Sequence, residues 1–289
     1  MRIAVTGARG LLGSEVARRL AADGHAVTGW SSGRHGGYRH ADVRRQEDID
    51  LALDSDRPDA VVHCAANPNI ASCEADPAAA RELNALAVQK LVGAAVAREI
   101  RVVHVSTDYV FSGGKDGGYD EDDPSDPLQV YGRTKAEAET YCADAEGVLV
   151  VRMPLLFGVS RVVPKATFPE QVIRQLRVGK EVEADAVEVR QPTYTTDIAA
   201  VIARLVEGKA TGVVHVAAQQ GITKFDWAVG LAGKAGLDAS PIRATQPRPD
   251  SNRPLRSFLL DHRLRDLGIP SPRPVSASAD AFLSEAGLL

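Results

Sequence analysis

Cysteine is scarce in this 289-residue chain, which has only Cys64, Cys73 and Cys142. The number is odd and no two of them form a Cys-x-x-Cys pair, so the pattern indicates neither a disulfide framework nor a zinc site. Free thiols of this kind suit a reducing compartment. The cysteine content therefore favours a cytoplasmic protein without a structural metal.

Long apolar runs and an excess of positive charge are also missing. No apolar run approaches the ~20 residues of a membrane span, and Ile3 to Val5 leads directly into glycine, without the apolar core of a signal peptide. The net charge of −4 gives no general attraction for nucleic acid or for an anionic membrane. We therefore expect a protein that binds neither nucleic acid nor a membrane.

The chain does have a regular alternation of valine-rich apolar runs with longer segments of helical period. Its 44% of hydrophobic residues are enough for a large core. The predicted strands are Arg2 to Thr6, His25 to Trp30, Ala60 to Ala65, Arg101 to Ser106, Val148 to Arg152 and Val213 to Ala217. The predicted helices are Gly10 to Asp23, Pro77 to Glu99, Gln129 to Ala145, Thr167 to Gly179, Thr196 to Glu207 and Lys224 to Ala235. This alternation predicts an α/β fold with a doubly wound parallel sheet of the Rossmann type.

A glycine run, TGARGLLG at Thr6 to Gly13, follows the first predicted strand directly. In such a strand-turn-helix unit, Gly7 would permit the tight turn, Gly10 would let the backbone approach a pyrophosphate, and Gly13 would let the helix pack close to the sheet. The N-terminus of the helix then faces the phosphates. The run therefore predicts a dinucleotide site.

The end of the second predicted strand bears on the choice between NAD and NADP. NAD-binding proteins usually place an acidic residue there, whereas this chain reads Trp30-Ser31-Ser32-Gly33-Arg34. No carboxylate would repel a 2′-phosphate, and Arg9 and Arg34 could grip it, with hydroxyl donors from Ser31 or Ser32. NADP(H) is therefore favoured, with NAD(H) as the alternative. The other interpretation of the two arginines is solvated surface charge.

The alternation weakens after about residue 155, where prolines multiply and turn signals cluster. We therefore expect an NAD(P)-binding Rossmann domain over residues 1–155 and a mainly substrate-binding lobe over residues 156–289. Some segments of the second half, about 193–218, are expected to return to the Rossmann sheet.

A second motif, Tyr131-x-x-x-Lys135, lies about 120 residues after the glycine run. On a helix the two residues are i and i+4 neighbours, so an ammonium stands near a phenol. A nearby cation favours the phenolate, and the pKa of Tyr131 would then fall toward the working pH. Such a tyrosine can protonate a carbonyl oxygen as hydride arrives.

Ser106, Thr107 and Asp108 follow at the carboxyl end of a predicted buried strand, the edge where sites form in such sheets. A hydroxyl from this segment would hydrogen-bond the substrate oxygen beside Tyr131. Together with the glycine run, these residues predict a nicotinamide-dependent enzyme that acts on a carbonyl or an alcohol.

These motifs resemble those of the extended short-chain dehydrogenases/reductases, and within them the dTDP-4-dehydrorhamnose reductase-like branch. The similarity covers residues 1–158 well and the C-terminal half more loosely. The segments that carry it are TGARGLLG (6–13), VVHCAA (61–66), CEADP (73–77), Asn84, HVSTDYVFSG (104–113), YGRTKAEAE (131–139), RQPTYTTDIA (190–199), GVVHVAA (212–218) and RPDSNRPL (248–255).

The resemblance implies a role for each motif. The Thr107 and Asp108 pair would tune Tyr131, the general acid, and Lys135 would also hold the nicotinamide ribose, so these four form the expected catalytic set. Asp42 and Val43, after a short third strand, would lie beside the adenine. The full set of implied cofactor contacts is Gly7, Arg9, Gly10, Leu11, Leu12, Gly13, Ser31, Ser32, Arg34, Asp42, Val43, Cys64, Ala65, Ala66, Asn84, Tyr131 and Lys135.

The expected substrate is a nucleotide-activated sugar. The implied substrate contacts are Thr107, Tyr109, Val110, Phe111, Gln191 and Thr193. Five basic residues are candidates for the diphosphate of such a substrate, although each alone is more often a surface charge. They are Arg152, Lys165, Arg174, Arg177 and Arg190.

The implied activity is the NADPH-dependent reduction of the 4-keto group of a 4-keto-6-deoxy sugar. Dehydratases of the superfamily usually carry Thr-Asp-Glu where this chain has Thr107-Asp108-Tyr109, so no glutamate is there to abstract a second proton. Two departures from the branch, RMPLLFG at 152–158 and the order of Ser251-Asn252, leave the sugar open. Residues 152–158 and 223–226 are similar to segments of the regulatory β subunit of methionine adenosyltransferase, so a nucleotide-binding regulatory subunit is the alternative.

Other features take a structural interpretation. His63, His104 and His215 each follow two valines on a predicted strand, and no ligand spacing supports a metal site. The acidic stretch 120–123 lacks the alternation of an EF-hand loop, so it is expected to be a solvated loop. Because many members of the superfamily pair through helices beside the sheet, a homodimer remains an option.

Overall fold

A seven-stranded parallel sheet forms the centre of the computed structural model, which describes residues 1–143, 145–247 and 252–289. The strand order is β11-β6-β5-β4-β1-β2-β3, so the chain winds outward from β1 in both directions. The strands are β1 (Arg2–Thr6), β2 (Ala26–Ser31), β3 (Arg39–His40), β4 (Ala60–His63), β5 (Arg101–Thr107), β6 (Val148–Met153) and β11 (Gly212–His215). This arrangement confirms the predicted doubly wound α/β fold.

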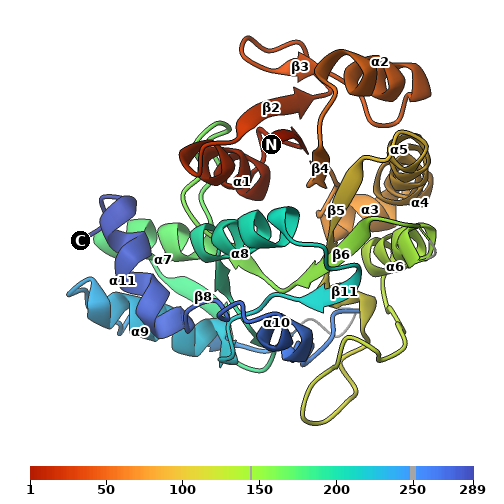
Figure 1. The fold of residues 1–289 in the computed structure, drawn as a ribbon. Helices are drawn as coiled ribbons and strands as arrows, with labels where there is room; N and C mark the ends of the chain where they lie inside the picture. The colour runs from red at the N-terminus through yellow and green to blue at the C-terminus, as the bar shows by residue number, and fades with distance from the viewer. Residues whose placement is uncertain (144, 248–251) are drawn as a thin grey trace.

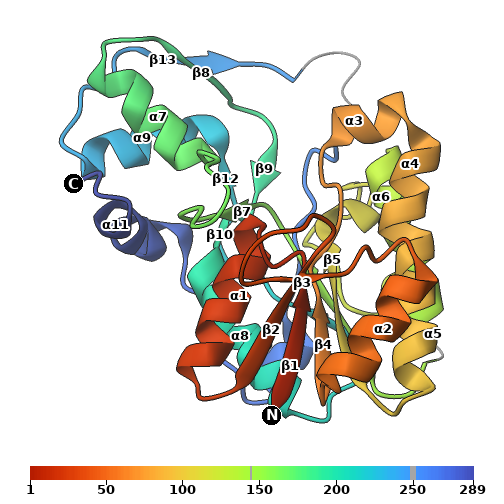
Figure 2. The same ribbon diagram turned by 90° about the horizontal axis from the view of Figure 1, so that it is seen from above.

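Helices cover both faces of this sheet (Figures 1 and 2). Helices α1 (Leu11–Ala22) and α8 (Thr195–Glu207) pack on one face, and α2 (Gln46–Asp56), α5 (Ala87–Val96) and α6 (Val130–Ala143) pack on the other. Every residue of β4 and β6 is buried. Because these strands are covered on both sides, they are continuous apolar runs rather than alternating ones.

The segment predicted as one helix from Pro77 to Glu99 is interrupted. It begins as α4 (Pro77–Arg81), passes through a π-helical turn, η1 (Glu82–Leu86), and continues as α5. A short helix, α3 (Ile70–Ala75), precedes it. A π-helical turn holds more residues than a regular turn, so the periodicity of the sequence does not show it.

Most of the remaining chain forms a second lobe beside the sheet (Figure 2). An aromatic cluster lies at its centre, where the Phe157 ring is 5.3 Å from Tyr194 and 5.1 Å from Trp227. The elements not yet named are η2 (Asp108–Val110), β7 (Leu156–Phe157), α7 (Phe168–Arg177), β8 (Val182–Asp185), β9 (Val189–Arg190), β10 (Thr193–Tyr194), β12 (Ile222–Thr223), α9 (Lys224–Lys234), β13 (Ile242–Thr245), α10 (His262–Asp266) and α11 (Val275–Glu285). Helix α8 and strand β11 come from this half of the chain but belong to the main sheet and its cover.

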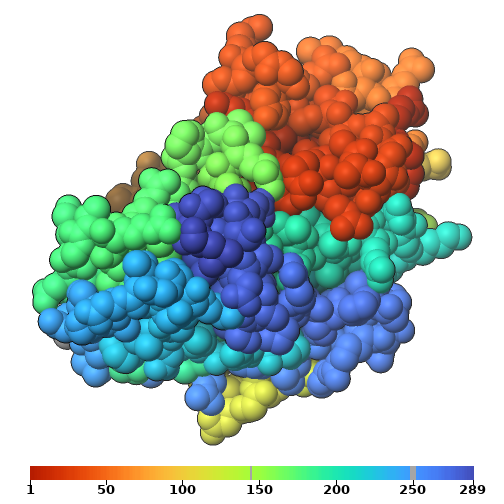
Figure 3. Space-filling view, turned by 90° about the vertical axis from the view of Figure 1, so that its left-hand side faces the viewer, coloured from red at the N-terminus to blue at the C-terminus, as the bar shows by residue number. Residues whose placement is uncertain are grey.

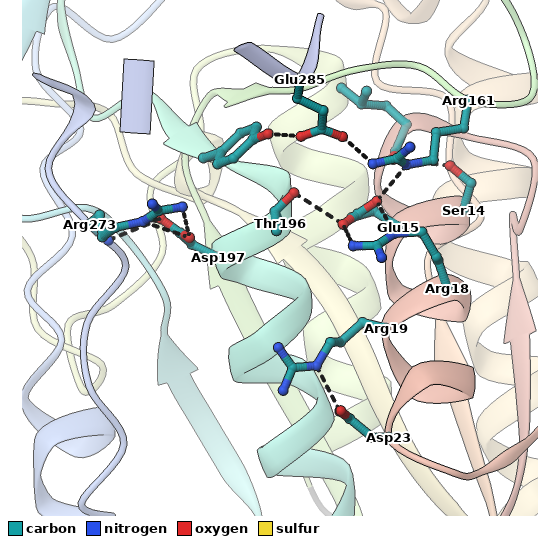
Figure 4. Close-up of polar contacts among 12 residues, drawn as sticks. Ser14, Glu15, Arg18, Arg19, Asp23, Arg161, Thr196, Asp197, Arg273 and Glu285 are labelled. Atoms are coloured by element: carbon teal, nitrogen blue, oxygen red, sulfur yellow. Dashed lines mark hydrogen bonds and ion pairs between the residues drawn. The ribbon is translucent and has the colours of Figure 1, made fainter. Parts of the chain in front are cut away.

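A buried carboxylate joins α1 to the second lobe. Glu15 is 3% exposed and accepts hydrogen bonds from Arg18, from Arg161 at 2.9 Å and from Thr196 at 3.1 Å (Figure 4). Arg161 also contacts Glu285 at the end of α11. On the surface, the dark-blue residues of α11 lie against the green segment that contains Arg161 (Figure 3). Burial alone would raise the pKa of Glu15, but the hydrogen bonds from Arg18 and Arg161 bring it down to about 2.

Candidate active site

The glycine run forms a tight turn between β1 and α1. Gly7 has a φ of +62°, in the left-handed region, and a Cβ atom on it would lie 2.8 Å from the backbone nitrogen of Ala65. A Cβ atom on Gly13 would meet the carbonyl oxygen of Gly7. Only glycine fits these two places without a backbone shift. The turn therefore leaves the N-terminus of α1, capped at Gly10, next to the segment that follows β4.

A cleft of about 450 Å³ opens above this turn, at the carboxyl ends of β1, β2 and β4. Its walls contain ten of the residues predicted to bind the cofactor, namely Gly7, Arg9, Gly10, Ser31, Ser32, Asp42, Val43, Cys64, Ala65 and Ala66. Thr6, Trp30, Ala41, Arg44 and Leu83 complete the lining. Seven predicted residues are not in this lining: Leu12 and Gly13 are buried, Leu11 is half-buried, Arg34 is exposed, and Asn84, Tyr131 and Lys135 belong to η1 and α6.

Two arginines of the cleft are held in different ways. Arg44 is bound to the carboxylate of Asp42, with its Nη2 2.6 Å from an Asp42 oxygen. The Arg44 side chain lowers the pKa of the Asp42 carboxyl through these hydrogen bonds. Arg9 instead donates to the ring nitrogen Nε2 of His35. Arg9 is therefore the less neutralised of the two cations. Its contact with His35 could not be predicted, because the loop from 32 to 38 has no regular period.

Tyr131 lies in the first turn of α6, where the helix meets the end of β5. Close approach is possible because residue 132 is glycine: a Cβ atom there would collide with the carbonyl oxygen of Tyr109. The rings of Tyr131 and Tyr109 lie edge to face, with centroids 6.0 Å apart. Thr107 ends β5, and its hydroxyl donates to Asp108 at 3.1 Å. The structure thus brings Tyr131, Thr107 and Asp108 together from two elements.

Burial dominates the electrostatics of these residues. It raises the pKa of the Tyr131 phenol, while a hydrogen bond with Thr107 lowers it in part. It also raises the pKa of Asp108, which is 2% exposed and accepts a hydrogen bond from Ser257 at 2.5 Å. Phenol and carboxyl are therefore both biased toward their protonated forms. This differs from the prediction that Lys135 would bring the pKa of Tyr131 down.

Lys135 is 2% exposed, and its ammonium points at β5 rather than at Tyr131. Its Nζ donates to the carbonyl oxygen of Val105 at 2.7 Å and lies 3.0 Å from Nε2 of His104. Burial lowers the pKa of Lys135 to about 8. An ammonium whose hydrogen bonds go to the strand has little effect on the phenol, which is the physical reason for the difference.

Asn84 reaches the site from the π-helical turn. It is completely buried, and its Oδ1 accepts from the backbone of Asn67 at 2.8 Å. Its Nδ2 donates to the carbonyl oxygen of Asn67 at 3.1 Å and to the hydroxyl of Thr134 at 3.2 Å. Asn84 therefore ties the segment after β4 to the helix that carries Tyr131 and Lys135.

The predicted substrate contacts divide into two groups. Tyr109 faces Tyr131, and the guanidinium of Arg190 lies 5.6 Å from the centroid of the Tyr109 ring. Val110 and Phe111 are completely buried in a small core with Tyr119, Ala217 and Leu259. A substrate contact of Val110 or Phe111 would therefore have to come from backbone atoms.

Gln191 and Thr193 have a different task from the predicted one. The amide of Gln191 is fully used: it donates to the carbonyl oxygens of Ala218 and Leu259 and accepts from the Leu259 nitrogen. Thr193 donates to the carbonyl oxygen of Gln191 and accepts from Ala218. Both are 1% exposed or less, so they bind neighbouring chain segments instead of facing a pocket. Sequence cannot reveal this, because the partners come from distant segments.

Ser106 also turns away from Tyr131. Its hydroxyl donates to Glu139 at 2.5 Å, and Glu139 forms a buried ion pair with Arg152 at 2.7 Å. Among the five basic candidates, Arg152 is thus committed to Glu139, Arg174 pairs with Glu170, Arg177 donates to the Leu288 carbonyl oxygen, and Lys165 is exposed.

Arg190 is the exception among these candidates. It is 5% exposed, and its Nη2 binds Glu188 at 2.8 Å. Its Nη1 is buried without a hydrogen-bond partner among the described residues. Half-buried Lys224 lies nearby in the same lobe, where burial and Arg253 lower its pKa. A buried guanidinium with an unused donor, next to Tyr109, is suited to an anionic group.

The sequence predicted neither a metal site nor a membrane-spanning helix. Within residues 1–143, 145–247 and 252–289, no group of three or more His, Cys, Asp and Glu side chains is arranged to hold a metal ion. No helix in the same part of the chain is long and apolar enough to cross a membrane. Of the motif RPDSNRPL, residues 248–251, including Ser251, lie outside the described residues.

A doubly wound sheet, a glycine-rich cleft and an adjoining Tyr-x-x-x-Lys helix define a protein of the short-chain dehydrogenase/reductase class. The family model described as the RmlD substrate binding domain matches residues 1–287. The chain therefore belongs to this family, as the motifs predicted.

Relatives agree with this assignment. The chain is 34% identical to a probable dTDP-4,6-dihydroxy-2-methyloxan-3-one 4-ketoreductase of Streptomyces antibioticus, over 98% of this chain and 95% of the relative. It is 33% identical to the probable low-salt glycan biosynthesis reductase Agl14 of Haloferax volcanii, over 88% of each. Because these relatives are named reductases, they confirm the prediction of an enzyme of the oxidoreductase class.

Solved structures share the fold closely. The dTDP-4-dehydrorhamnose reductase of Bacillus anthracis, in complex with NADP, superimposes with a TM-score of 0.90 at 23% identity, over 98% of this chain and 99% of the other.

The predicted similarity to the regulatory β subunit of methionine adenosyltransferase is found as well. Methionine adenosyltransferase 2 subunit beta of Rattus norvegicus is 28% identical over 94% of this chain and 84% of its own length.

Proposed function

We propose that this protein is an NADPH-dependent ketoreductase that reduces the 4-keto group of a nucleotide-activated 4-keto-6-deoxy sugar. The observation that carries the proposal is the meeting of Tyr131, Thr107 and Asp108 at the end of β5, with Lys135 one helical turn further along α6. Two relatives named as reductases of the same family support it.

The cleft above the glycine turn fits a dinucleotide. The Gly7 turn has no room for a side chain, so backbone can approach a pyrophosphate beside the N-terminus of α1. Arg9, with Ser31 and Ser32, would take the 2′-phosphate of NADP, and Asp42 and Val43 would lie at the adenine. The Bacillus anthracis structure, which contains NADP, supports this choice of cofactor.

When bound, the cofactor supplies a hydride for the ketone carbon. Tyr131 then delivers the balancing proton to the ketone oxygen, and burial, which favours the protonated phenol, suits it to act as an acid. To donate to the same oxygen, the single hydroxyl proton of Thr107 would turn from Asp108 to the substrate. Lys135 would supply the positive charge that stabilises the phenolate left after proton transfer.

The second lobe would hold the nucleotide diphosphate. Arg190 and Lys224 are the basic residues whose placement suits it best, because Arg190 keeps one buried donor unused beside Tyr109. A diphosphate would provide the missing acceptor. On this proposal, residues 1–155 bind the cofactor and residues 156–289 mainly bind the substrate.

The test is NADPH oxidation, followed by its near-ultraviolet absorbance, with a panel of nucleotide-linked 4-keto-6-deoxy sugars. Tyr131→Phe should lower kcat by about 10²–10⁴-fold, because it removes the general acid while keeping the ring. Tyr141→Phe, at a half-buried tyrosine on the same helix that donates to Glu137, is the matched control. Turnover that is equal in Tyr131→Phe and the native protein would reject the proposal.

A nucleotide-binding regulatory subunit is the second candidate. Its support is the similarity to methionine adenosyltransferase 2 subunit beta along most of the chain. Tight NADPH binding without turnover on any keto sugar, together with capture of a catalytic methionine adenosyltransferase subunit, would favour it. A homodimer and a cytoplasmic location stay predictions, to be checked by light scattering and by cell fractionation.

A further inference from the structure

Two histidines form a buried pair directly behind the proposed active site. His63 on β4 and His104 on β5 are register partners in the parallel sheet, and their rings stack with centroids 5.4 Å apart. Both side chains are 1% exposed or less. The proposed mechanism uses neither of them. Burying the polar nitrogens of two imidazole rings costs free energy unless they are hydrogen-bonded, so the bonds that these rings make are informative.

The hydrogen bonds of Lys135 show what one of these rings does. An ammonium has three donors. One goes to the carbonyl oxygen of Val105 at 2.7 Å, and another faces Nε2 of His104 at 3.0 Å. A charged ammonium is donor only, so Nε2 of His104 must be the unprotonated acceptor and the ring proton must sit on Nδ1.

A protonated His104 would put a second cation against Lys135 in a buried site. Burial, and then the charge of Lys135, hold the pKa of His104 well below its usual range, so the neutral form of the ring is favoured. Nδ1 of His104 is buried without a partner among the described residues. The ring therefore gives up one of its own hydrogen bonds while its other nitrogen serves the lysine.

We infer that His104 is a positioning residue for Lys135: its Nε2 atom accepts a hydrogen bond from the ammonium, holds it against β5 and favours its charged form. The inference rests on the proposed function only for the role of Lys135 in catalysis. The hydrogen bond itself favours the charged form of Lys135, as any acceptor does.

Other titratable groups also face Lys135. Cys64 follows β4, His63 stands behind His104, and Glu139 and Cys142 share the helix with the lysine. Glu139 is already bound to Arg152 and Ser106. Both cysteines are thiols whose pKa burial raises to about 12, so neither is an anion near neutral pH. None of these groups can replace His104 as a close acceptor.

Two amides make a matched pair of substitutions. The terminal atoms of glutamine reach the position of Nε2 in a histidine ring, whereas those of asparagine reach only the position of Nδ1. His104→Gln therefore keeps an acceptor for Lys135, and His104→Asn removes it while keeping a polar side chain. His63→Asn changes the stacked neighbour, whose hydrogen bond goes to Thr6 rather than to Lys135, and controls for the loss of a buried imidazole.

The first measurement is the titration of Lys135 itself in the cofactor-free protein. The ε-carbon resonance in protein labelled with ¹³C-lysine reports it, and Lys135→Met assigns the signal. We expect His104→Asn to lower the titration midpoint by about one to two pH units, and His104→Gln and His63→Asn to leave it near the native value. If His104→Asn does not fold, His104→Leu takes its place.

A native midpoint in His104→Asn would overturn the inference, and so would an equal shift in all three variants, which would indicate a packing effect. The second measurement is the pH profile of kcat. Because Lys135 would lose its proton at lower pH, the alkaline fall of kcat should move down by the same amount in His104→Asn and stay in place in His104→Gln. If no keto sugar is reduced, the titration still decides the inference, so its failure and that of the proposed function remain separate.

Discussion

Glu15 and Lys135 are both buried charges, but their surroundings differ in kind. Glu15 is surrounded by opposite charge from Arg18 and Arg161 and by the Thr196 hydroxyl (Figure 4). Among the residues that the structure describes, Lys135 has a carbonyl oxygen and the ring of His104 as its hydrogen-bond partners. The pKa values follow: that of Glu15 falls to about 2, which favours its charge, whereas that of Lys135 falls to about 8, which disfavours it.

Glu15 is thus a buried charge that stabilises the fold, whereas Lys135 is a buried charge that does not. A buried carboxylate with paired cations holds α1 against the second lobe at little net cost. A buried ammonium without a carboxylate partner costs stability, and such costs are typical of functional sites. The two regions should therefore respond to the loss of their charge with opposite sign.

The largest stability effect is expected for Glu15→Gln, which leaves Arg18 and Arg161 without their carboxylate. Because the pKa of Glu15 is lowered in the folded state, its contribution is complete above pH ~4.5 and is lost as the pH falls toward about 2. Denaturant unfolding near pH 7 should show a loss of about 3 kcal/mol. The native protein should lose this difference in acid, where the variant stays flat.

Glu47→Gln is the control for Glu15. Its side chain is 81% exposed, and its ion pair with Arg45 is 4.0 Å long. Such a pair contributes less than about 1 kcal/mol. An equally small effect of Glu15→Gln would remove the distinction between the two regions.

A somewhat smaller effect of opposite sign is expected for Lys135→Met. The pKa of Lys135 is lowered in the folded state, so the unfolded chain binds the extra proton between pH ~8 and ~10.5, and native stability rises with pH over that window. Lys135→Met should therefore stabilise the protein by about 2 kcal/mol near pH 7 and by almost nothing above pH ~10.5. Keto-sugar reduction should be lost in the same variant.

Exposed Lys165→Met should leave the unfolding free energy within about 0.5 kcal/mol, and it serves as the control for Lys135. Destabilisation by Lys135→Met near pH 7 would show that the ammonium is a structural group like Glu15. Both measurements use chemical denaturation over a range of pH.

The smallest effect is expected for two arginines of the cofactor cleft, of which one is paired with a carboxylate and the other with a histidine. Arg9 contacts the ring of His35, whereas Arg44 is bound to the carboxylate of Asp42. Arg9→Ser should weaken NADPH binding about tenfold relative to NADH, because an uncommitted cation gives its full attraction to a 2′-phosphate. Arg44→Ser should change that ratio by about twofold or less. Fluorescence titration of both cofactors measures it, and equal ratios in the two variants would contradict the expectation.

Much of the fold could be predicted from the sequence because it depends on local pattern. Valine-rich runs and helical periods located six strands of the sheet, and the glycine spacing located the turn at Gly7. Helix α2 was missed, because only Ile49, Ala52 and Leu53 of its eleven residues are buried and the apolar period is short. A polar surface helix gives little signal of this kind.

The site could be predicted in its residues but not in their orientation. Tyr131 and Thr107 lie where strand-end reasoning put them, and the cleft contains most of the expected contacts. The directions of Lys135, Ser106 and Gln191 depend on partners from distant segments, namely His104, Glu139 and Leu259. A single sequence contains no information on such pairs, so the electrostatics of the site could not be derived from it.

The π-helical turn at Glu82–Leu86 makes the length of one helix a requirement of the site. An ordinary helix turns by about 100° per residue, so deleting one residue between Pro77 and Asn84 would rotate the asparagine away from Asn67 and Thr134. Every remaining side chain could be unchanged and the link to α6 would still be lost. In this segment, insertions and deletions should therefore be tolerated less well than most substitutions.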